Sequence, residues 1–222
     1  MNSMKEITAL AARRKGGNKA LMSLLSHPST RQKIRRIPDN RWLSAMTKCV
    51  FQAGFNWQLI ENKWDRFEAV FEDFDIDRWV MMSDEDLDRL LKTDGIVRNA
   101  NKIRSVGQNA ALLAEIAGTY GSAGKYFSTW EPSDYCNNLR ELQKKGARLG
   151  GKTGQVSLRR MGVDTLIFSP DVLKALKREG IIDKMPTSNR DWAAVQQAID
   201  AWHSESGRTL TEISQILAYS VE

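Results

Sequence analysis

Cysteine and histidine are scarce in this sequence. Among 222 residues there are two cysteines, Cys49 and Cys136, and two histidines, His27 and His203. Two cysteines exclude a disulfide framework. Four such residues scattered along the chain also make a four-ligand zinc or iron–sulfur site improbable. We therefore expect no metal, no cofactor and a reducing, cytoplasmic environment.

Long hydrophobic runs and strand patterns are also missing. No apolar run approaches the roughly 18 residues of a membrane span, and the N-terminal segment lacks the order of charge and apolar core of a signal peptide. We expect no membrane association. Apolar and polar residues do not alternate as they do in strands, and helical spacing predicts an all-α protein of roughly ten to twelve short helices.

Helix boundaries and core positions are marked along the chain. Ser83 and Asp86 form a capping box, and Asp39 is the predicted N-cap of an earlier helix. Between Trp57 and Phe74, aromatic and aliphatic residues recur every three to four positions, which predicts a buried helical stripe.

Charge is segregated along the sequence. The segment 61–94 has 12 acidic and 5 basic residues, whereas the segment 95–160 has 11 basic and 4 acidic residues. The whole chain carries a formal net charge of +6. Such segregation favours a basic face suited to a polyanion, although two solvated faces of opposite sign explain it equally well.

A glycine-rich segment, 139–165, is the most informative stretch. It has the pattern of a helix, a glycine-rich hairpin and a second helix, with Asp164 just beyond. A helix that begins directly after a flexible turn points free N–H groups and the positive end of its dipole outward. These features suit a phosphate group. Between Leu142 and Arg160 the segment has no acidic residue and six basic ones: Lys144, Lys145, Arg148, Lys152, Arg159 and Arg160.

Three separated motifs resemble one known family. They are Gln52-Ala-Gly-Phe-Asn-Trp57, then Asp94-Gly-Ile-Val-Arg-Asn99 with Lys102-Ile103, and then Lys145-Gly-Ala-Arg-Leu-Gly-Gly-Lys-Thr153. In this order and at these distances they resemble the 3-methyladenine DNA glycosylase I family of the helix-hairpin-helix glycosylase superfamily. The resemblance covers roughly residues 42–162.

The resemblance implies a fold and a division of the chain. The family has a two-lobed, all-α helix-hairpin-helix glycosylase fold with a central cleft. We expect N-terminal helices at 1–36 that pack with the C-terminal lobe, a helix-hairpin-helix core at 37–165 and C-terminal helices at 166–222.

The resemblance also implies roles for the hairpin. Its backbone and flanking side chains would grip the DNA backbone. The residues concerned are Arg148, Gly150, Gly151, Lys152 and Thr153.

On the other side of the cleft, the resemblance implies a pocket for an extruded base. Trp57 would stack on the base, beside Cys49, Gln52 and Phe51, and Phe55 would be a wedge that fills the gap in the duplex. Without the family, Trp57 and Phe55 would both be read as core residues.

The chain departs from the family at two points. The family has a pocket glutamate at the position aligned with Cys49, and a thiol is a poor acceptor for a base amine. Glu61 can share a helical face with Gly54 and Trp57 and is an alternative carboxylate, although an exposed surface role also fits it. The family's zinc ligands near both termini are missing as well.

Two residues near the hairpin resemble catalytic positions of a second branch, the endonuclease III branch. Asp164 lies in a Val-Asp-Thr motif, in which the aspartate stabilises positive charge on the sugar and helps to activate the nucleophile. A helix cap is the alternative. Lys152 matches a Schiff-base lysine, and a plain phosphate contact is the alternative.

These observations lead to one main hypothesis and two alternatives. The main hypothesis is a monofunctional base-excision repair glycosylase that hydrolyses the N-glycosidic bond of an alkylated, 3-methyladenine-like purine in damaged double-stranded DNA. We expect it to act as a monomer in the cytoplasm, associated with the nucleoid when on DNA, with Asp164 as the catalytic residue. The alternatives are a non-catalytic DNA-binding relative and a bifunctional glycosylase/lyase that uses Lys152.

Overall fold

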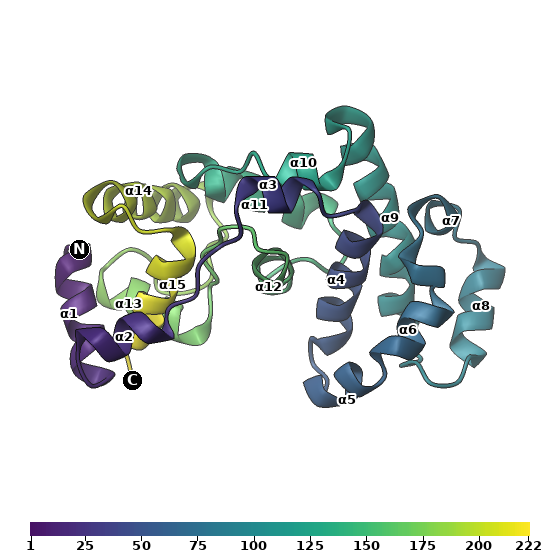
Figure 1. Cartoon of the computed structure of the whole chain (residues 1–222), viewed down its shortest axis with the longest axis horizontal. Coiled ribbons are helices and arrows are strands. Elements are labelled where there is room, and N and C mark those ends of the chain that lie inside the picture. Colours follow the sequence, from purple (N-terminus) through teal and green to yellow (C-terminus); the bar gives the residue numbers. More distant parts are fainter. The chain divides into compact units, whose positions relative to one another are not determined.

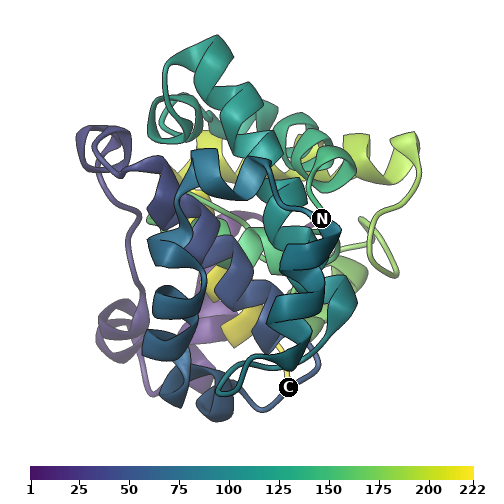
Figure 2. The ribbon, with the colours of Figure 1, turned by 90° about the vertical axis from the view of Figure 1, so that its right-hand side faces the viewer.

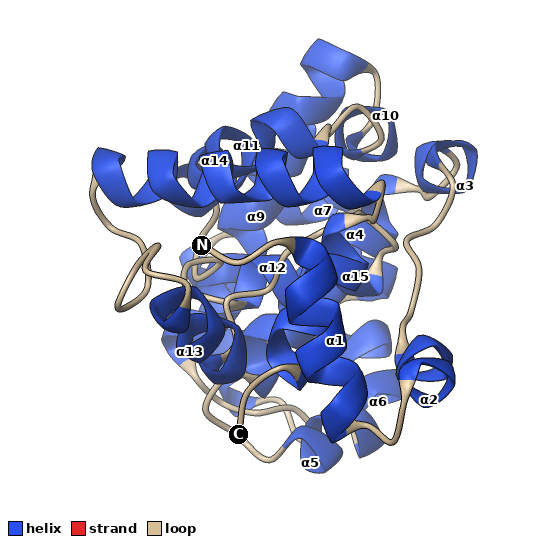
Figure 3. Cartoon of the chain, turned by 90° about the vertical axis from the view of Figure 1, so that its left-hand side faces the viewer, coloured by secondary structure: helices blue, strands red, loops and turns tan.

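The computed structural model describes all 222 residues and contains only helices and loops (Figure 3). The all-α prediction is confirmed. There are fifteen α-helices and two short 3-10 helices, and they pack into two compact units. No helix is both long and apolar enough to cross a membrane.

The first unit, unit 1, combines both ends of the chain and comprises residues 1–29, 130–140 and 162–222. Its helices are α1 (Met4–Arg14), α2 (Asn18–Leu24), η2 (Pro132–Asp134), α13 (Pro170–Arg178), α14 (Asn189–Ser206) and α15 (Leu210–Tyr219). Helix α1 packs on α15 and α14. Because α15 and α14 bring Ile213 and Trp202 into the same interior as Ile7, the first helix of the chain completes the core of its last helices.

The second unit, unit 2, comprises residues 30–129 and 141–161 (Figure 1). Its helices are α3 (Arg31–Arg35), α4 (Asp39–Gln52), α5 (Trp57–Asn62), α6 (Trp64–Val70), η1 (Glu72–Phe74), α7 (Ile76–Val80), α8 (Asp84–Lys92), α9 (Ala100–Tyr120), α10 (Ala123–Phe127) and α12 (Thr153–Arg160). Helix α11 (Tyr135–Lys145) has residues in both units.

Helices α4 and α9 form the centre of unit 2, where α7 and α8 pack on α9 (Figure 2). Helix α12 packs on α4. Beside α4, a run of stacked rings fills the interior: Trp64 stacks on Phe67 and Phe74 at centroid distances of 5.1 and 5.6 Å, and Phe71 stacks on Phe74 at 5.3 Å. This rigid aromatic core fixes the face that α4 presents to α12.

Of the two helix starts predicted from local signals, one is confirmed and one is off by a residue. Ser83 and Asp86 form the predicted capping box at the start of α8. The predicted N-cap Asp39 is one residue off: Pro38 occupies that position, and the Asp39 carboxylate instead accepts a hydrogen bond from the Ala123 N–H at 2.8 Å. The side chain thereby connects α4 to the start of α10.

The predicted stripe between Trp57 and Phe74 is not one continuous face. The chain breaks at Lys63 and again at Phe71, which gives α5, α6 and η1 and raises the number of helices above the ten to twelve expected. Phe67, Phe71 and Phe74 are buried as predicted, but Trp57 is 51% exposed. Because α5 begins at Trp57 after an extended turn, the indole lies on the surface.

Candidate functional site

Unit 2 has a pocket of about 430 Å³ between α4, α5 and the end of α12. This volume falls in the range of small-molecule sites and is ample for a purine ring. Helix α4 contributes Lys48 and Gln52, helix α5 contributes Trp57, Gln58 and Glu61, and helix α12 contributes Arg160.

Helical spacing explains how α4 and α5 line this pocket. Lys48 and Gln52 are four residues apart on α4, and Trp57 and Glu61 are four apart on α5, so each pair shares a face. The start of α5 is fixed by Asn56, whose Oδ1 accepts hydrogen bonds from the N–H groups of Gln58 at 2.9 Å and Leu59 at 3.3 Å. This cap sets the position of the Trp57 indole at the first turn.

A chain of polar contacts connects the side chains of the pocket. Lys48 Nζ lies 2.7 Å from Glu61 Oε1, and the Gln52 side-chain amide donates to Glu61 Oε2 at 3.1 Å. Arg160 Nη1 donates to Gln52 Oε1 at 2.6 Å. The hydrogen bond from Lys48 lowers the pKa of Glu61. The pocket therefore contains an ionised carboxylate at neutral pH.

The Arg160 guanidinium makes two further contacts. Its Cζ lies 4.9 Å from the centroid of the Trp57 ring, a cation–π distance. Its Nη1 also lies 3.4 Å from the Sγ of Cys49, which is buried. Burial raises the pKa of the Cys49 thiol, and the positive charge of Arg160 opposes that rise. Cys49 thus lies behind the pocket and contacts it through Arg160.

Phe51 does not line the pocket, although the sequence places it there. Its side chain is fully buried, with its ring 4.8 Å from that of Phe67 in an edge-on contact. Consecutive residues of an α-helix point about 100° apart. Because Gln52 faces the pocket, its neighbour Phe51 must face the aromatic core.

Phe55, the candidate wedge, lies in the loop between α4 and α5 and is 40% exposed. Gly54 has a φ of +75°, which lets the chain reverse direction after α4. The buried Lys102 of α9 donates from Nζ to the carbonyls of Phe51 at 3.0 Å and Ala53 at 2.7 Å. The loop that carries Phe55 is therefore held in place by the Lys102 side chain of α9.

The predicted hairpin is present between α11 and α12. Arg148, Gly150, Gly151 and Lys152 are exposed, and Thr153 is half-buried at the first position of α12. Helix α12 has no side-chain cap, and the N–H groups of Thr153 and Gly154 instead donate to the turn carbonyls of Gly150 and Leu149, each at 3.2 Å. The five residues predicted to grip DNA thus lie together on one exposed turn.

Contacts from two sides keep this turn rigid. The buried Asn109 of α9 donates to the Ala147 carbonyl at 3.1 Å and accepts from its N–H at 2.9 Å. The side-chain amides of Gln155 and Gln143 both donate to the Gly151 carbonyl, at 2.8 and 3.0 Å. A surface that is fixed in advance binds a ligand with a smaller loss of conformational entropy.

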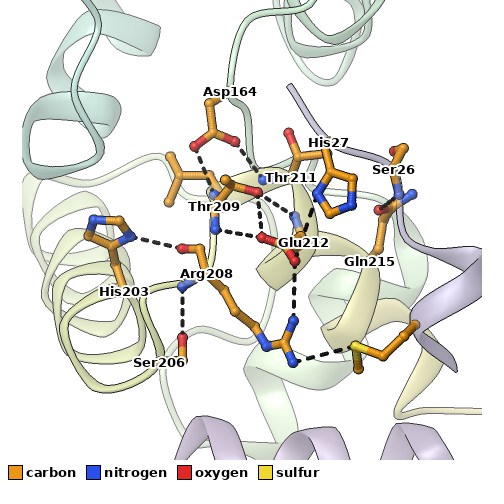
Figure 4. A network of polar contacts seen from close by, with 12 residues as sticks. Ser26, His27, Asp164, His203, Ser206, Arg208, Thr209, Thr211, Glu212 and Gln215 are labelled. Atoms are coloured by element: carbon orange, nitrogen blue, oxygen red, sulfur yellow. Dashed lines mark hydrogen bonds and ion pairs between the residues drawn. The ribbon is translucent and has the colours of Figure 1, made fainter. Parts of the chain in front are cut away.

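Asp164 lies in unit 1 at the N-terminus of α15 (Figure 4). Its two carboxylate oxygens accept hydrogen bonds from the backbone N–H groups of Leu210 at 3.0 Å and Thr211 at 2.8 Å. Thr209 and Glu212 form a separate capping box on the same helix. The carboxylate is held rigidly against the positive end of the helix dipole.

Sequence reasoning did not assign most of the pocket's polar side chains to it. Lys48 and Gln58 went unnoticed, Glu61 was only an alternative, and Arg160 was counted with the basic hairpin. The spacing of Lys48 to Gln52 and of Trp57 to Glu61 was the available signal for α4 and α5. No local signal could have found Arg160, because only the packing of α12 on α4 brings it there. No group of three or more His, Cys, Asp or Glu side chains is placed to hold a metal.

Comparisons with known proteins agree with the geometry of unit 2. DNA-3-methyladenine glycosylase 1 of Escherichia coli (strain K12) is 36% identical over 65 residues, which is 29% of this chain and 35% of that protein. The chain thus matches about a third of the length of this relative.

Two solved structures share the fold. The 3-methyladenine DNA glycosylase I of Staphylococcus aureus superposes with a TM-score of 0.51 at 23% identity, over 57% of this chain and 77% of that one. The Methanocaldococcus jannaschii 8-oxoguanine glycosylase/lyase, solved with a 15mer DNA that contains 8-oxoguanine, superposes with a TM-score of 0.50 at 15% identity, over 96% of each chain. The likeness in fold to this second structure therefore extends to the C-terminal helices, which the three motifs did not cover.

The family model described as methyladenine glycosylase matches residues 35–155. This range contains the three motifs, the whole pocket except Arg160, and the exposed turn with its five residues. The resemblance seen in the motifs is thereby confirmed, and the chain belongs to the methyladenine glycosylase family.

Proposed function

We propose that this protein is a base-excision repair glycosylase that hydrolyses the N-glycosidic bond of an alkylated purine in duplex DNA. The base leaves the stack, because its glycosidic bond is inaccessible inside the duplex. It enters the pocket in unit 2 and stacks on Trp57, while Phe55 fills the gap in the duplex.

One observation carries this proposal: the pocket and the exposed basic turn belong to the same compact unit. The turn offers the side chains of Arg148 and Lys152 and a glycine backbone to phosphates. The pocket offers a half-exposed indole and polar groups to a base. Backbone grip and base recognition are the two functions that a base-flipping enzyme must combine.

Asp164 is the proposed catalytic residue. Its carboxylate is fixed by two backbone N–H groups, so the side chain does not have to change conformation during the reaction. In the endonuclease III branch, which the Val-Asp-Thr motif resembles, such a carboxylate stabilises the positive charge that develops on the sugar as the base departs. The same geometry also serves as a helix cap, so the experiment has to separate the two roles.

The test is a base-release assay on duplexes that carry single alkylated purines, scored as abasic sites. Wild type is compared with Asp164→Asn and with Thr209→Ala. Both substitutions weaken the N-terminus of α15, each by about 1 kcal/mol, but only Asp164→Asn removes the carboxylate. We expect base release by the wild type, a rate at least about a hundredfold lower for Asp164→Asn and near-normal release by Thr209→Ala.

Other outcomes decide between the alternatives. Equal losses of base-release activity in Asp164→Asn and Thr209→Ala would show that Asp164 acts only as a helix cap. Salt-dependent duplex binding by the wild type without base release identifies a non-catalytic DNA-binding relative. A covalent enzyme–DNA species trapped with borohydride, and absent in Lys152→Gln, identifies a lyase. For the proposed enzyme we expect a monomer in the cytoplasm, with no trapped species.

A further inference from the structure

Unit 2 has a second basic surface, formed by elements other than those of the exposed turn. Helix α3 packs on α10, and the two helices lie side by side in Figures 1 and 3. The segment 30–38 has four basic residues and no acidic one, and the only charged residue of α10 is the exposed Lys125. Three exposed cations define what we call the α3 surface: Lys33, Arg35 and Arg36.

The charges of the α3 surface are not used inside the protein. Several other cations of unit 2 have carboxylate partners at 2.7 to 2.9 Å. The side chains of Lys33, Arg35 and Arg36 form no ion pair. The nearest acidic residue along the chain, Asp39, accepts a hydrogen bond from the Ala123 N–H at 2.8 Å. The three cations are therefore available to an anion outside the protein.

The backbone that carries these cations is fixed in place. The Thr30 hydroxyl caps α3 by accepting a hydrogen bond from the Lys33 N–H at 3.4 Å. The side chain of Ile34 is buried. On α10, Gly124 lies so close to the end of α3 that a Cβ there would be 2.6 Å from the Ile34 carbonyl oxygen. A rigid backbone lowers the entropy lost when a ligand binds.

Helix α9 sets the spacing between the α3 surface and the exposed turn. Asn109 of α9 holds the turn through two hydrogen bonds to Ala147. Helix α10 follows the end of α9 at Tyr120 and packs on it. Asn109 and Tyr120 are 11 positions apart on α9, which corresponds to about 16 Å along the helix axis. Phosphates of one DNA strand are spaced by about 3.4 Å along the duplex, so this spacing equals about five base pairs.

The chemistry of the α3 surface favours a phosphate backbone over an apolar partner. None of the large apolar side chains that are exposed in this protein lies on α3 or α10. A helix that binds a membrane or fills an apolar groove would present such side chains. Guanidinium groups, in contrast, match the geometry of phosphate oxygens and donate two hydrogen bonds at once.

We propose that the α3 surface is a second phosphate-binding surface, which contacts the same DNA duplex about five base pairs from the exposed turn, on one side of the lesion. This inference rests on the proposed glycosylase function and extends its DNA interface beyond the pocket and the turn. The α3 surface adds affinity through charge and carries no information about the lesion.

Duplexes that differ in the length of one flank test the proposal. Each contains one alkylated purine, and its flanks are about 4 or about 12 base pairs long, so that a contact five base pairs beyond the turn exists only on the longer flank. One duplex is short on both sides, and two others are extended on the 5′ or the 3′ side of the lesion. Binding is titrated at several salt concentrations.

Three proteins are compared on these duplexes. They are the wild type, a triple variant of the α3 surface and a control triple variant of unit 1. The α3 variant combines Lys33→Gln, Arg35→Gln and Arg36→Gln. The control combines Arg13→Gln, Lys19→Gln and Arg190→Gln, which removes the same number of exposed charges from the other unit.

We expect the wild type to bind one of the two extended duplexes about tenfold or more tightly than the short one, with a slope of log K against log salt that is steeper by about 2 to 3. The α3 variant should lose this gain and match the wild type on the short duplex. The control variant should behave as the wild type. Base release at saturating enzyme should be equal in all three proteins, because the α3 surface does not contact the base.

Several results would overturn the α3 surface and leave the glycosylase function standing. One is wild-type affinity and salt slope of the α3 variant on every duplex. Another is an equal loss of affinity on the short and the extended duplexes. If the melting temperature of the triple variant falls, Arg36→Gln alone repeats the test, with an expected loss of about 1 in the slope on the extended duplex and none on the short one.

Failure of the proposed function gives a different pattern. Binding without base release removes the glycosylase function, whereas the dependence of affinity on flank length still decides the α3 surface. A wild type that binds no duplex at all overturns both proposals.

Discussion

The Lys102 ammonium lies over the ring of Phe55, with Nζ 4.2 Å from the ring centroid. The same Nζ donates to the carbonyls of Phe51 and Ala53, which are freed at the C-terminal end of α4. One buried cation therefore closes a helix end and supports the candidate wedge. The sequence motif that contains Lys102 lies far from Phe55 in the chain, and this contact explains how the two motifs act together.

This contact predicts an unusual pH dependence of stability. Burial, reinforced by the charge of Arg148, lowers the pKa of Lys102 to about 8 from 10.5. Below pH 8 the Lys102 amine is charged in both the folded and the unfolded state, and burial of this charge destabilises the folded state. As pH rises from 8 to 10.5, the folded state releases the proton first, so the free energy of unfolding gains a positive contribution.

Urea denaturation of wild type and Lys102→Met at several pH values measures this effect. The difference in unfolding free energy, wild type minus variant, should increase between about pH 7 and pH 10. A difference that decreases over this range would contradict the assignment. Lys102→Met should also release the 53–56 loop, which we expect to appear as faster amide exchange there.

Trp57 should matter for activity and not for stability. Stacking of a base on an aromatic side chain contributes about 1–3 kcal/mol, so Trp57→Ala should lower kcat/KM for base release by roughly tenfold to a hundredfold. Because the indole is half exposed, the melting temperature should change little. Leu59→Ala is the matched control, since Leu59 is exposed on the same helix and does not line the pocket. Equal effects of the two substitutions would remove the stacking role.

Two glycines of the hairpin should respond in opposite ways. A Cβ on Gly150 would meet no atom within 4 Å, whereas a Cβ on Gly154 would lie 2.7 Å from the Leu149 carbonyl oxygen. Gly150→Ala should therefore fold normally but hold phosphate less closely, and duplex affinity should fall by about tenfold. Gly154→Ala should destabilise the protein by about 1–3 kcal/mol. Thermal denaturation and duplex titration of both variants measure the contrast. Normal DNA binding by Gly150→Ala would show that the turn backbone does not approach phosphate.

Lys152 should contribute to DNA binding through charge alone. Loss of one phosphate contact reduces the slope of log K against log salt by about 1 and weakens all sequences equally. We expect this result for Lys152→Gln, measured by titration of undamaged duplexes at several salt concentrations. Arg13→Gln provides a charge-matched control on α1. An unchanged slope for Lys152→Gln would place this side chain away from the DNA.

The sequence by itself determined the helical class, the start of α8, the hairpin and the family. These features depend on interactions within a few residues, such as the Ser83 capping box or the glycine turn before α12, so local patterns report them. The motif match depended on three such local segments. Asp39 shows the limit, because its carboxylate is used by the start of α10 and not by its own helix.

Only the tertiary structure decided which side chains meet in the pocket. The packing of α4 against the aromatic core sets the orientation of this helix about its axis. Gln52 therefore faces the pocket and Phe51 faces the core. The packing of α12 on α4 adds Arg160, which changes the net charge of the site. Contacts between residues distant in the chain depend on how complete helices pack. The periodicity within one helix does not determine which other helix it packs against. The hairpin could therefore be predicted from the sequence, whereas the character of the base pocket could not.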